Sequence, residues 1–216
     1  VLIHPQWVLT VAHTIFYDYR GKALSIAGQE QRISQVIFHP NYQPLDTALL
    51  EGDSGPLMEF FQQRSDIALI QLEQAIVGVQ PISLYKDSNE QGLDVTIIGE
   101  GATGDGKIGE QTATKSEKVL RQCENRIVEA DGNWLMYVFD HPGQSLAFEG
   151  MHGSGDSGGP SITYIEDQPF LVGLSSWQYW NGDLADFKGG LYGAKAFQVR
   201  VSQYVPWIES VISGCE

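Results

Sequence analysis

The chain has 216 residues, 42% of them hydrophobic and 19% charged, which is long enough for one large or two small domains with a buried core. Thirteen Lys and Arg against 27 Asp and Glu give a formal net charge of -14, which argues against nucleic acid or an anionic membrane as a partner, because both need a basic face. The longest apolar runs, such as residues 95–98, are too short to span a bilayer.

Most apolar runs are short, rich in β-branched residues and bounded by Gly, Pro, Asn or Asp, which predicts strands and turns. In chain order the predicted strands are residues 7–10, 35–38, 67–71, 95–98, 134–139, 161–165 and 170–175. One long helix is predicted over residues 201–212, where the apolar residues share one face and Gly214 follows as a stop. This order favours an antiparallel barrel or sandwich, and the polar stretch 85–92 is the predicted linker between two halves.

Two nearly identical turns stand out, GDSGP at residues 52–56 and GDSGGP at residues 155–160. Gly, Asp, Ser and Pro are what any surface turn uses, so one copy can arise by chance. The second copy has glycine on both sides of Ser157 and runs directly into an apolar strand. Glycine lets backbone amides turn toward a developing negative charge, so Ser157 is the better candidate nucleophile.

Two further segments bear on that choice. WVLTVAH at residues 7–13 places His13 at the end of an apolar strand, and SDIALIQL at residues 65–72 places Asp66 at the head of another. With the Ser157 turn, these segments resemble the chymotrypsin/trypsin-like serine protease family, whose signatures are WVLTAAHC, DIALL and GDSGGP. Further matches are GEG at 99–101 for GWG, FLVGLSSW at 170–177 for VGIVSWG, GLY at 190–192 for GVY and YVPWI at 204–208 for YxxWI. The family order is His, Asp, Ser, which Ser157 satisfies and Ser54 does not, so Ser54 is expected to be a loop residue beside the substrate cleft.

The resemblance implies an all-β fold of two antiparallel six-stranded β-barrels, chymotrypsin-like, with a C-terminal α-helix. Residues 1–88 are expected to form the first barrel, which carries His13 and Asp66, and residues 89–216 the second, which carries Ser157 and the helix. Val1 aligns downstream of the family's usual N-terminus, so the first barrel is expected to be truncated.

It also implies a serine endopeptidase that works through an acyl-enzyme. His13 would act as general base and then acid, Asp66 would orient it, and Ser157 would attack the scissile carbonyl. The backbone N–H groups of Gly155 and Ser157 would form the oxyanion hole. Ser176, Trp177 and Gln178 would pair with the substrate backbone, with Ser176 also near Asp66.

Primary specificity is expected to be for a neutral side chain of small to medium size. Alignment through Ser157 puts Met151 at the floor of the primary pocket, where a trypsin-like enzyme has aspartate, so a cationic preference is not expected. Gln178 replaces a usual glycine and would narrow the pocket, while Gly190 leaves the opposite wall open. His152 could instead face the pocket and favour an acidic side chain.

Several family features are missing. Thr14 follows His13 where a disulfide cysteine is usual, which favours a disulfide-poor, microbial and bacterial branch of the family. The two cysteines, Cys123 and Cys215, have no metal-ligand spacing, and whether they pair is open. In the family an N-terminal amino group created by proteolysis pairs with the aspartate before the nucleophile, here Asp156.

Two alternatives come from other classes. The first is a non-catalytic protease homologue that acts as a binding or regulatory module. The second is an α/β-hydrolase esterase, which the order of the triad and the lack of alternating strand–helix units argue against. No cofactor or metal is predicted. The expected partners are polypeptide substrates and protein inhibitors, with no nucleic acid or membrane, and the chain is expected to be a monomer, secreted or periplasmic.

Overall fold

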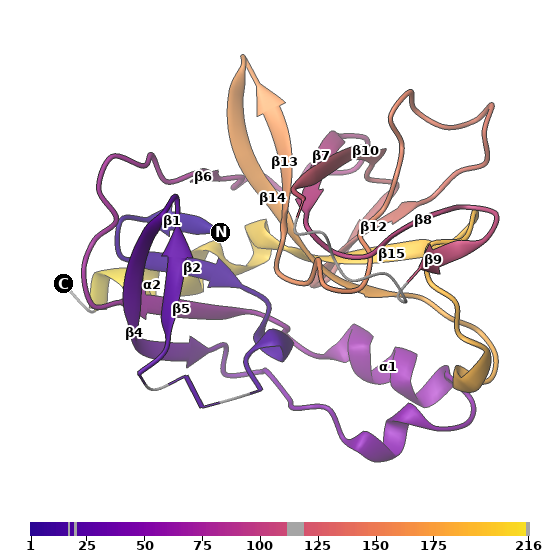
Figure 1. Ribbon diagram of the computed structural model, residues 1–216, viewed down its shortest axis with the longest axis horizontal. Helices are drawn as coiled ribbons and strands as arrows, with labels where there is room; N and C mark the ends of the chain where they lie inside the picture. The colour runs from indigo at the N-terminus through magenta and orange to yellow at the C-terminus, as the bar shows by residue number, and fades with distance from the viewer. Residues whose placement is uncertain (17, 20, 112–118, 215–216) are drawn as a thin grey trace.

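Strands dominate the chain in the computed structural model, which describes residues 1–16, 18–19, 21–111 and 119–214 (Figure 1). The first sheet is antiparallel and has the order β1-β2-β5-β4-β3. Its strands are β1 (Leu2–His4), β2 (Trp7–Thr10), β3 (Ala23–Ile26), β4 (Gln29–Phe38) and β5 (Ala68–Leu72).

The second sheet has eight strands in the order β10-β7-β13-β14-β15-β12-β11, with β6 pairing in parallel with β14 outside this path. Its strands are β6 (Ser83–Leu84), β7 (Asp94–Gly99), β10 (Arg121–Arg126), β11 (Glu129–Asp131), β12 (Trp134–Val138), β13 (Pro160–Ile165), β14 (Gln168–Gln178) and β15 (Lys195–Arg200). A separate hairpin joins β8 (Thr103–Asp105) and β9 (Gly109–Gln111). Each predicted strand therefore corresponds to an observed one, with ends shifted by a few residues.

One apolar core joins the two sheets. Leu9 and Leu69 of the first sheet belong to the same buried cluster as Leu171, Leu174 and Val199 of the second. Burial of apolar side chains is the main favourable term in folding, so this shared cluster holds the sheets together. The expected fold class, all-β with two antiparallel β-barrels and a C-terminal helix, is confirmed, except that the described sheets have five and eight strands where six each were expected.

The C-terminal helix also follows the prediction. It opens as a 3-10 helix, η4 (Val201–Tyr204), and continues as α2 (Val205–Gly214). Pro206 lies in the first turn of α2, where a missing backbone N–H costs nothing. Tyr204 and Ile208 are buried against the shared core. In the described part of the chain, no helix is long and apolar enough to cross a membrane.

A second helix, α1 (Gly55–Gln63), was not predicted, because the sequence analysis expected only a turn around Ser54. Ser54 occupies the position before the first helical residue, and Pro56 lies in the first turn, where its fixed φ suits a helix. Leu57 and Met58 are buried. The remaining helices are single 3-10 turns, η1 (Ala12–Thr14), η2 (Thr47–Leu50) and η3 (Leu184–Asp186).

The predicted linker is firmly anchored. Glu90 is fully buried, and its carboxylate accepts hydrogen bonds from the Arg200 guanidinium at 2.7 and 2.9 Å. The preceding strand, β6, already pairs with β14 of the second sheet. The chain thus changes sheets before Ser83, and the domain boundary between residues 88 and 89 stays a prediction.

Candidate active site

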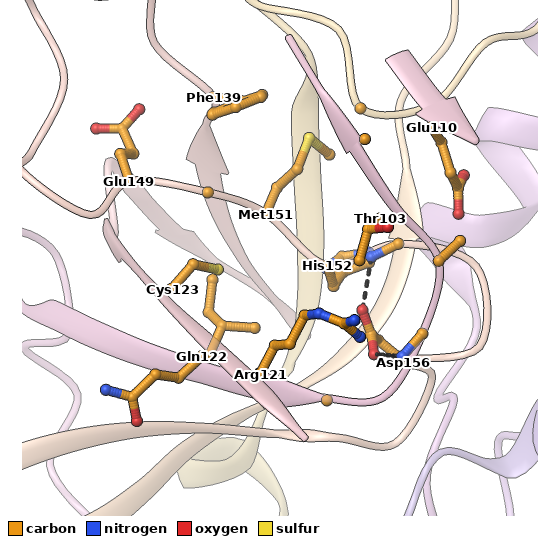
Figure 2. Close-up of a pocket in the computed structure, with 18 residues that line it drawn as sticks. Thr103, Glu110, Arg121, Gln122, Cys123, Phe139, Glu149, Met151, His152 and Asp156 are labelled. Carbon is orange, nitrogen blue, oxygen red and sulfur yellow. Dashed lines mark hydrogen bonds between the residues drawn. The ribbon is translucent and has the colours of Figure 1, made fainter. Parts of the chain in front are cut away.

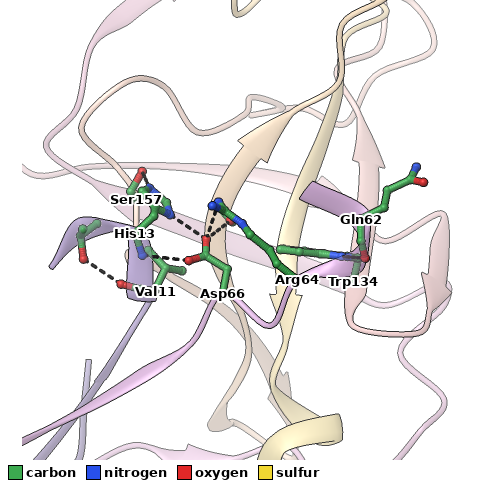
Figure 3. A network of polar contacts seen from close by, with 9 residues as sticks. Val11, His13, Gln62, Arg64, Asp66, Trp134 and Ser157 are labelled. Carbon is green, nitrogen blue, oxygen red and sulfur yellow. Dashed lines mark hydrogen bonds and ion pairs between the residues drawn. The ribbon is translucent and has the colours of Figure 1, made fainter. Parts of the chain in front are cut away.

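His13, Asp66 and Ser157 come together where the two sheets meet (Figure 3). His13 lies in η1 directly after β2, Asp66 precedes β5, and Ser157 precedes β13. The Nδ1 of His13 is 2.6 Å from Oδ2 of Asp66, and its Nε2 is 2.9 Å from Oγ of Ser157. The His13 backbone N–H also donates to Oδ1 of Asp66 at 2.9 Å. A carboxylate, an imidazole and a hydroxyl in this order can transfer a proton from the hydroxyl to the imidazole.

Asp66 is fully buried and has four donors. Besides the two bonds from His13, Ser176 Oγ donates to Oδ2 at 2.6 Å, and Arg64 Nη2 donates to the same oxygen at 3.2 Å. Burial alone would raise the pKa of Asp66, but the hydrogen bond and charge of His13, the charge of Arg64 and the hydrogen bond from Ser176 outweigh it, so the pKa lies below its usual range. Asp66 is thereby held as a carboxylate.

The turn that carries Ser157 is shaped by glycine. Gly155 has φ +97°, a conformation that a residue with a side chain rarely adopts. The Asp156 carboxylate accepts from the backbone N–H of Gly101 at 2.6 Å and of Gly153 at 2.8 Å, and a Cβ on Gly101 would overlap it. Among the described residues, the N–H groups of Gly155 and Ser157 donate to no protein acceptor.

A cavity of about 220 Å³ lies beside Ser157. Four of the predicted substrate-binding residues line it, namely His152, Ser176, Trp177 and Gln178. Its apolar wall is contributed by α1 and by the segment after β14, through Leu57, Met58, Phe61, Trp180, Leu184 and Phe187. The loop before Asp66 was expected beside the cleft, but its sequence did not show that it forms a helix with these apolar side chains.

Met151 and Gly190 lie elsewhere. Both line a second cavity of about 240 Å³, together with Cys123, Phe139 and Asp156 (Figure 2). Neither residue lines the cavity beside Ser157. The assignment of Met151 to the floor of the primary pocket and of Gly190 to its wall stays a prediction.

His152 is buried and lines both cavities. Its Nδ1 is 2.8 Å from the Tyr137 hydroxyl. Burial lowers the pKa of His152 to about 4, so the imidazole is neutral at pH 7. A neutral ring offers no positive charge to an acidic substrate side chain, which weakens the alternative of an acidic preference.

Ser54, the serine of the first GDSGP copy, is buried away from this arrangement. Its Oγ donates to the Trp180 carbonyl at 3.0 Å and accepts from the Gly182 N–H at 3.2 Å. Both partners belong to the segment after β14. Ser54 thus joins the start of α1 to that segment, and no histidine is among its hydrogen-bond partners in the described part of the chain.

Two charged residues near the candidate site were not predicted from the sequence. Arg64 is only 3% exposed and contacts Asp66, and Glu110 of β9 accepts from the Ser154 backbone N–H and, at 3.1 Å, from the Ser154 hydroxyl. Arg64 lies two residues before Asp66, yet nothing in that spacing shows that it turns inward. Cys123 forms no disulfide with a described residue, and its pairing with Cys215 concerns a residue that lies outside the described part of the chain. No cluster of three or more potential metal ligands occurs among the residues with described positions.

The architecture and the contact between His13, Asp66 and Ser157 define a chain of the chymotrypsin-like class. A sequence model of the family described as Trypsin matches residues 1–208, so the chain belongs to the trypsin family of serine proteases. Curated relatives include Vitamin K-dependent protein C of Rattus norvegicus, 28% identical over 239 residues, of Oryctolagus cuniculus, 27% over 242, and of Mus musculus, 26% over 241. These matches cover 98%, 100% and 98% of this chain but only 45%, 46% and 45% of the relatives, so the chain spans less than half of their length.

Proposed function

We propose that the chain is a serine endopeptidase in which His13, Asp66 and Ser157 form the catalytic triad. The observation that carries the proposal is the unbroken line of hydrogen bonds from Asp66 through His13 to Ser157 in a chain of the trypsin family. Ser157 Oγ attacks the scissile carbonyl carbon while His13 Nε2 takes its proton. His13 then gives that proton to the leaving amine, and an ester of Ser157 remains. Water, deprotonated by His13, attacks the ester carbonyl; the C–O bond to Ser157 breaks, His13 returns the proton to Ser157 Oγ, and the carboxylic acid is released.

The backbone around Ser157 supports the charge that develops in this reaction. We assign the oxyanion hole to the N–H groups of Gly155 and Ser157, which have no acceptor within the described part of the protein. Asp156 accepts from the backbone N–H of Gly153 in the same turn and of Gly101 in the segment after β7, which supports a fixed shape of the turn.

An extended polypeptide substrate fits the open edge of β14. β13 pairs with β14 only as far as Leu174, so residues 176–178 have no β13 partner on that side. A substrate strand could add there through main-chain hydrogen bonds. Ser176, Trp177 and Gln178 are thus the proposed substrate-binding residues, and a neutral side chain of small to medium size is the proposed preference before the scissile bond.

The test is labelling of the natural full-length protein with a fluorophosphonate, followed by mass spectrometry of its peptides. We expect an adduct on Ser157 that is lost in His13→Ala and kept in the matched variant His141→Ala, since His141 is exposed. Ser54→Ala should still be labelled. Absence of the adduct from the folded natural protein would favour the alternative of a non-catalytic homologue that binds or regulates.

A further inference from the structure

Glu110 of β9 contacts the turn that carries Ser157. Its carboxylate accepts one hydrogen bond from the backbone N–H of Ser154 and another from the Ser154 hydroxyl at 3.1 Å. Its own backbone N–H donates to the Gly189 carbonyl at 2.8 Å. Glu110 is thus fixed through both its backbone and its side chain, and Ser154 is the residue that its carboxylate holds.

Two glycines leave space for this carboxylate. A Cβ on Gly153 would lie 3.0 Å from Glu110 Oε1, and a Cβ on Gly189 would lie 2.9 Å from Glu110 Oε2. A side chain at either position would therefore crowd one of the two oxygens. The approach of Glu110 to Ser154 thus depends on three segments that are far apart in the sequence.

The carbonyl of Ser154 belongs to the peptide that supplies the first donor of the proposed oxyanion hole. This carbonyl accepts from the Ala102 N–H at 2.8 Å. The same peptide carries the Gly155 N–H, and no peptide bond of the described residues is cis. In a trans peptide the carbonyl and the N–H point in opposite directions, so the bond from Ala102 also sets the direction of the Gly155 N–H.

This peptide would rotate easily without support. Its rotation changes ψ of Ser154 and φ of Gly155, and glycine resists the change little because it tolerates positive and negative φ alike. Gly155 has φ +97° in the observed orientation. The restraint must therefore come from Ser154, whose N–H, hydroxyl and carbonyl all have partners. Two of these three groups bind Glu110.

We propose that Glu110 is a positioning residue, which holds Ser154 so that the Gly155 N–H stays directed at the oxyanion. This inference rests on the proposed function, because the oxyanion forms only during acyl transfer. A negative charge near a developing oxyanion repels it, so the benefit of Glu110 lies in its acceptor atoms and not in its charge. Glutamine at this position keeps an acceptor for the Ser154 N–H and a polar group for the Ser154 hydroxyl, whereas alanine keeps neither.

The experiment measures peptide hydrolysis by the natural protein, Glu110→Ala and Glu110→Gln. Loss of an oxyanion donor lowers kcat by about 100–1,000-fold, and a donor that is misdirected for part of the time should cost less. We therefore expect kcat of Glu110→Ala to fall about 10–100-fold while KM changes less than about 3-fold, and kcat of Glu110→Gln to stay within about 3-fold of the natural value. The matched control is Glu129→Ala, an exposed glutamate of β11, which should leave both constants unchanged.

Three results would overturn the proposal. They are a natural kcat in Glu110→Ala, an equal loss of kcat in Glu110→Gln, and a rise of KM without a fall in kcat, which would make Glu110 a substrate contact instead. Urea denaturation shows whether each variant is folded. If Glu110→Ala is not folded, Glu110→Asp replaces it, because the shorter side chain stays polar but withdraws both acceptor atoms from Ser154.

A spectroscopic measurement separates this inference from the proposed function. Nuclear magnetic resonance of isotope-labelled protein follows the Gly155 amide directly, without any reaction at Ser157. We expect this signal to shift or to broaden by exchange in Glu110→Ala and to stay sharp in Glu110→Gln and Glu129→Ala. That result supports the positioning role even if Ser157 is never labelled by a fluorophosphonate, in which case only the proposed function fails. Normal labelling with an unchanged Gly155 signal in Glu110→Ala overturns the positioning role alone, and an unchanged signal in a protein that is never labelled counts against both.

Discussion

Arg64 offers the sharpest test of how Asp66 is held. Its guanidinium lies 3.2 Å from Asp66 Oδ2, with Cζ 4.6 Å from the centre of the Phe61 ring, and both charged groups are almost completely buried. We predict that Arg64→Met, which keeps apolar length but removes the charge, lowers the free energy of unfolding by about 3 kcal/mol at pH 7. The measurement is urea denaturation of both proteins.

This magnitude follows from the contacts that remain. Two unit charges at 3.2 Å attract by about 5 kcal/mol at an effective dielectric constant of 20, and removal of one partner of a buried pair typically costs about 3–5 kcal/mol. We expect the low end, because His13 and Ser176 still donate to Asp66 in the variant. For a chain of this length, 3 kcal/mol corresponds to a fall in Tm of about 6–12 °C.

The pH dependence provides a second reading of the same pair. The pKa of Asp66 is lowered in the folded protein, so its ionisation stabilises the fold above the ordinary carboxyl range, and this contribution is lost as the pH falls through the folded pKa. Arg64→Met removes the part of the lowering of the Asp66 pKa that comes from the charge of Arg64. The gap in stability between the two proteins should thus be widest at neutral pH and narrow as the solution becomes acidic.

Two controls make the reasoning refutable. Arg64→Lys retains a positive charge and should lose less stability than Arg64→Met. In a double-mutant cycle with Asp66→Asn, the combined loss should be smaller than the sum of the single losses. If Arg64→Met is as stable as the natural protein at pH 7, or if the losses simply add, the ion pair does not contribute as argued.

Three other predictions follow from contacts away from the triad. Ser54→Ala should lower the free energy of unfolding, measured by urea denaturation, by about 1–3 kcal/mol, because the partners of its hydroxyl are left unsatisfied. Ser157 should still be labelled by a fluorophosphonate in this variant. Loss of labelling would show that Ser54 takes part in the chemistry. Arg200→Met should lower the free energy of unfolding by about 3–5 kcal/mol at pH 7, because Glu90 would stay buried without its charged partner. Burial raises the pKa of Glu90, but the hydrogen bonds from Arg200 and Ser202 outweigh this effect and the pKa is lowered, so the loss of stability should shrink in acid. A loss of stability that does not depend on pH would contradict this. Burial, together with the charge of Asp156, raises the pKa of Cys123 to about 12. Alkylation of Cys123 by iodoacetamide at pH 8, followed by mass spectrometry, should therefore be much slower in the folded than in the unfolded protein. Equal alkylation rates would refute this prediction.

The sequence was sufficient to predict which segments carry the candidate triad. His13 follows one apolar strand and Asp66 precedes another, and neighbouring strands of one antiparallel sheet bring such ends together. β2 and β5 are adjacent in the first sheet. The contact between His13 and Asp66 therefore depends on a strand pairing that short sequence patterns can predict. Ser157 joins them only through the packing of the second sheet on the first.

What the sequence did not reveal depends on the direction of individual side chains. The helix α1 had a recognisable start, with Pro56 in its first turn, but the repeated GDSGP favoured interpretation as a loop. Nothing local shows that Gln178 reaches both His152 and Gly190, because these partners lie 26 and 12 residues away along the chain. Alignment alone assigned Met151 to the floor of the primary pocket, and it does not show which cavity the side chain lines.

The helix α1 links features that appear unrelated in the sequence. A hydrogen bond from Ser54 joins its first turn to the Trp180 carbonyl, and its buried face lines the cavity beside Ser157. Its last residue is followed by Arg64, which contacts Asp66. We expect a change at the Ser54 end to affect the cavity wall more than Asp66, because the length of the helix and the Arg64 side chain separate Ser54 from Asp66. Variants at Ser54 should accordingly alter KM for peptides with large apolar residues more than the rate of labelling at Ser157, whereas variants at Arg64 should alter both.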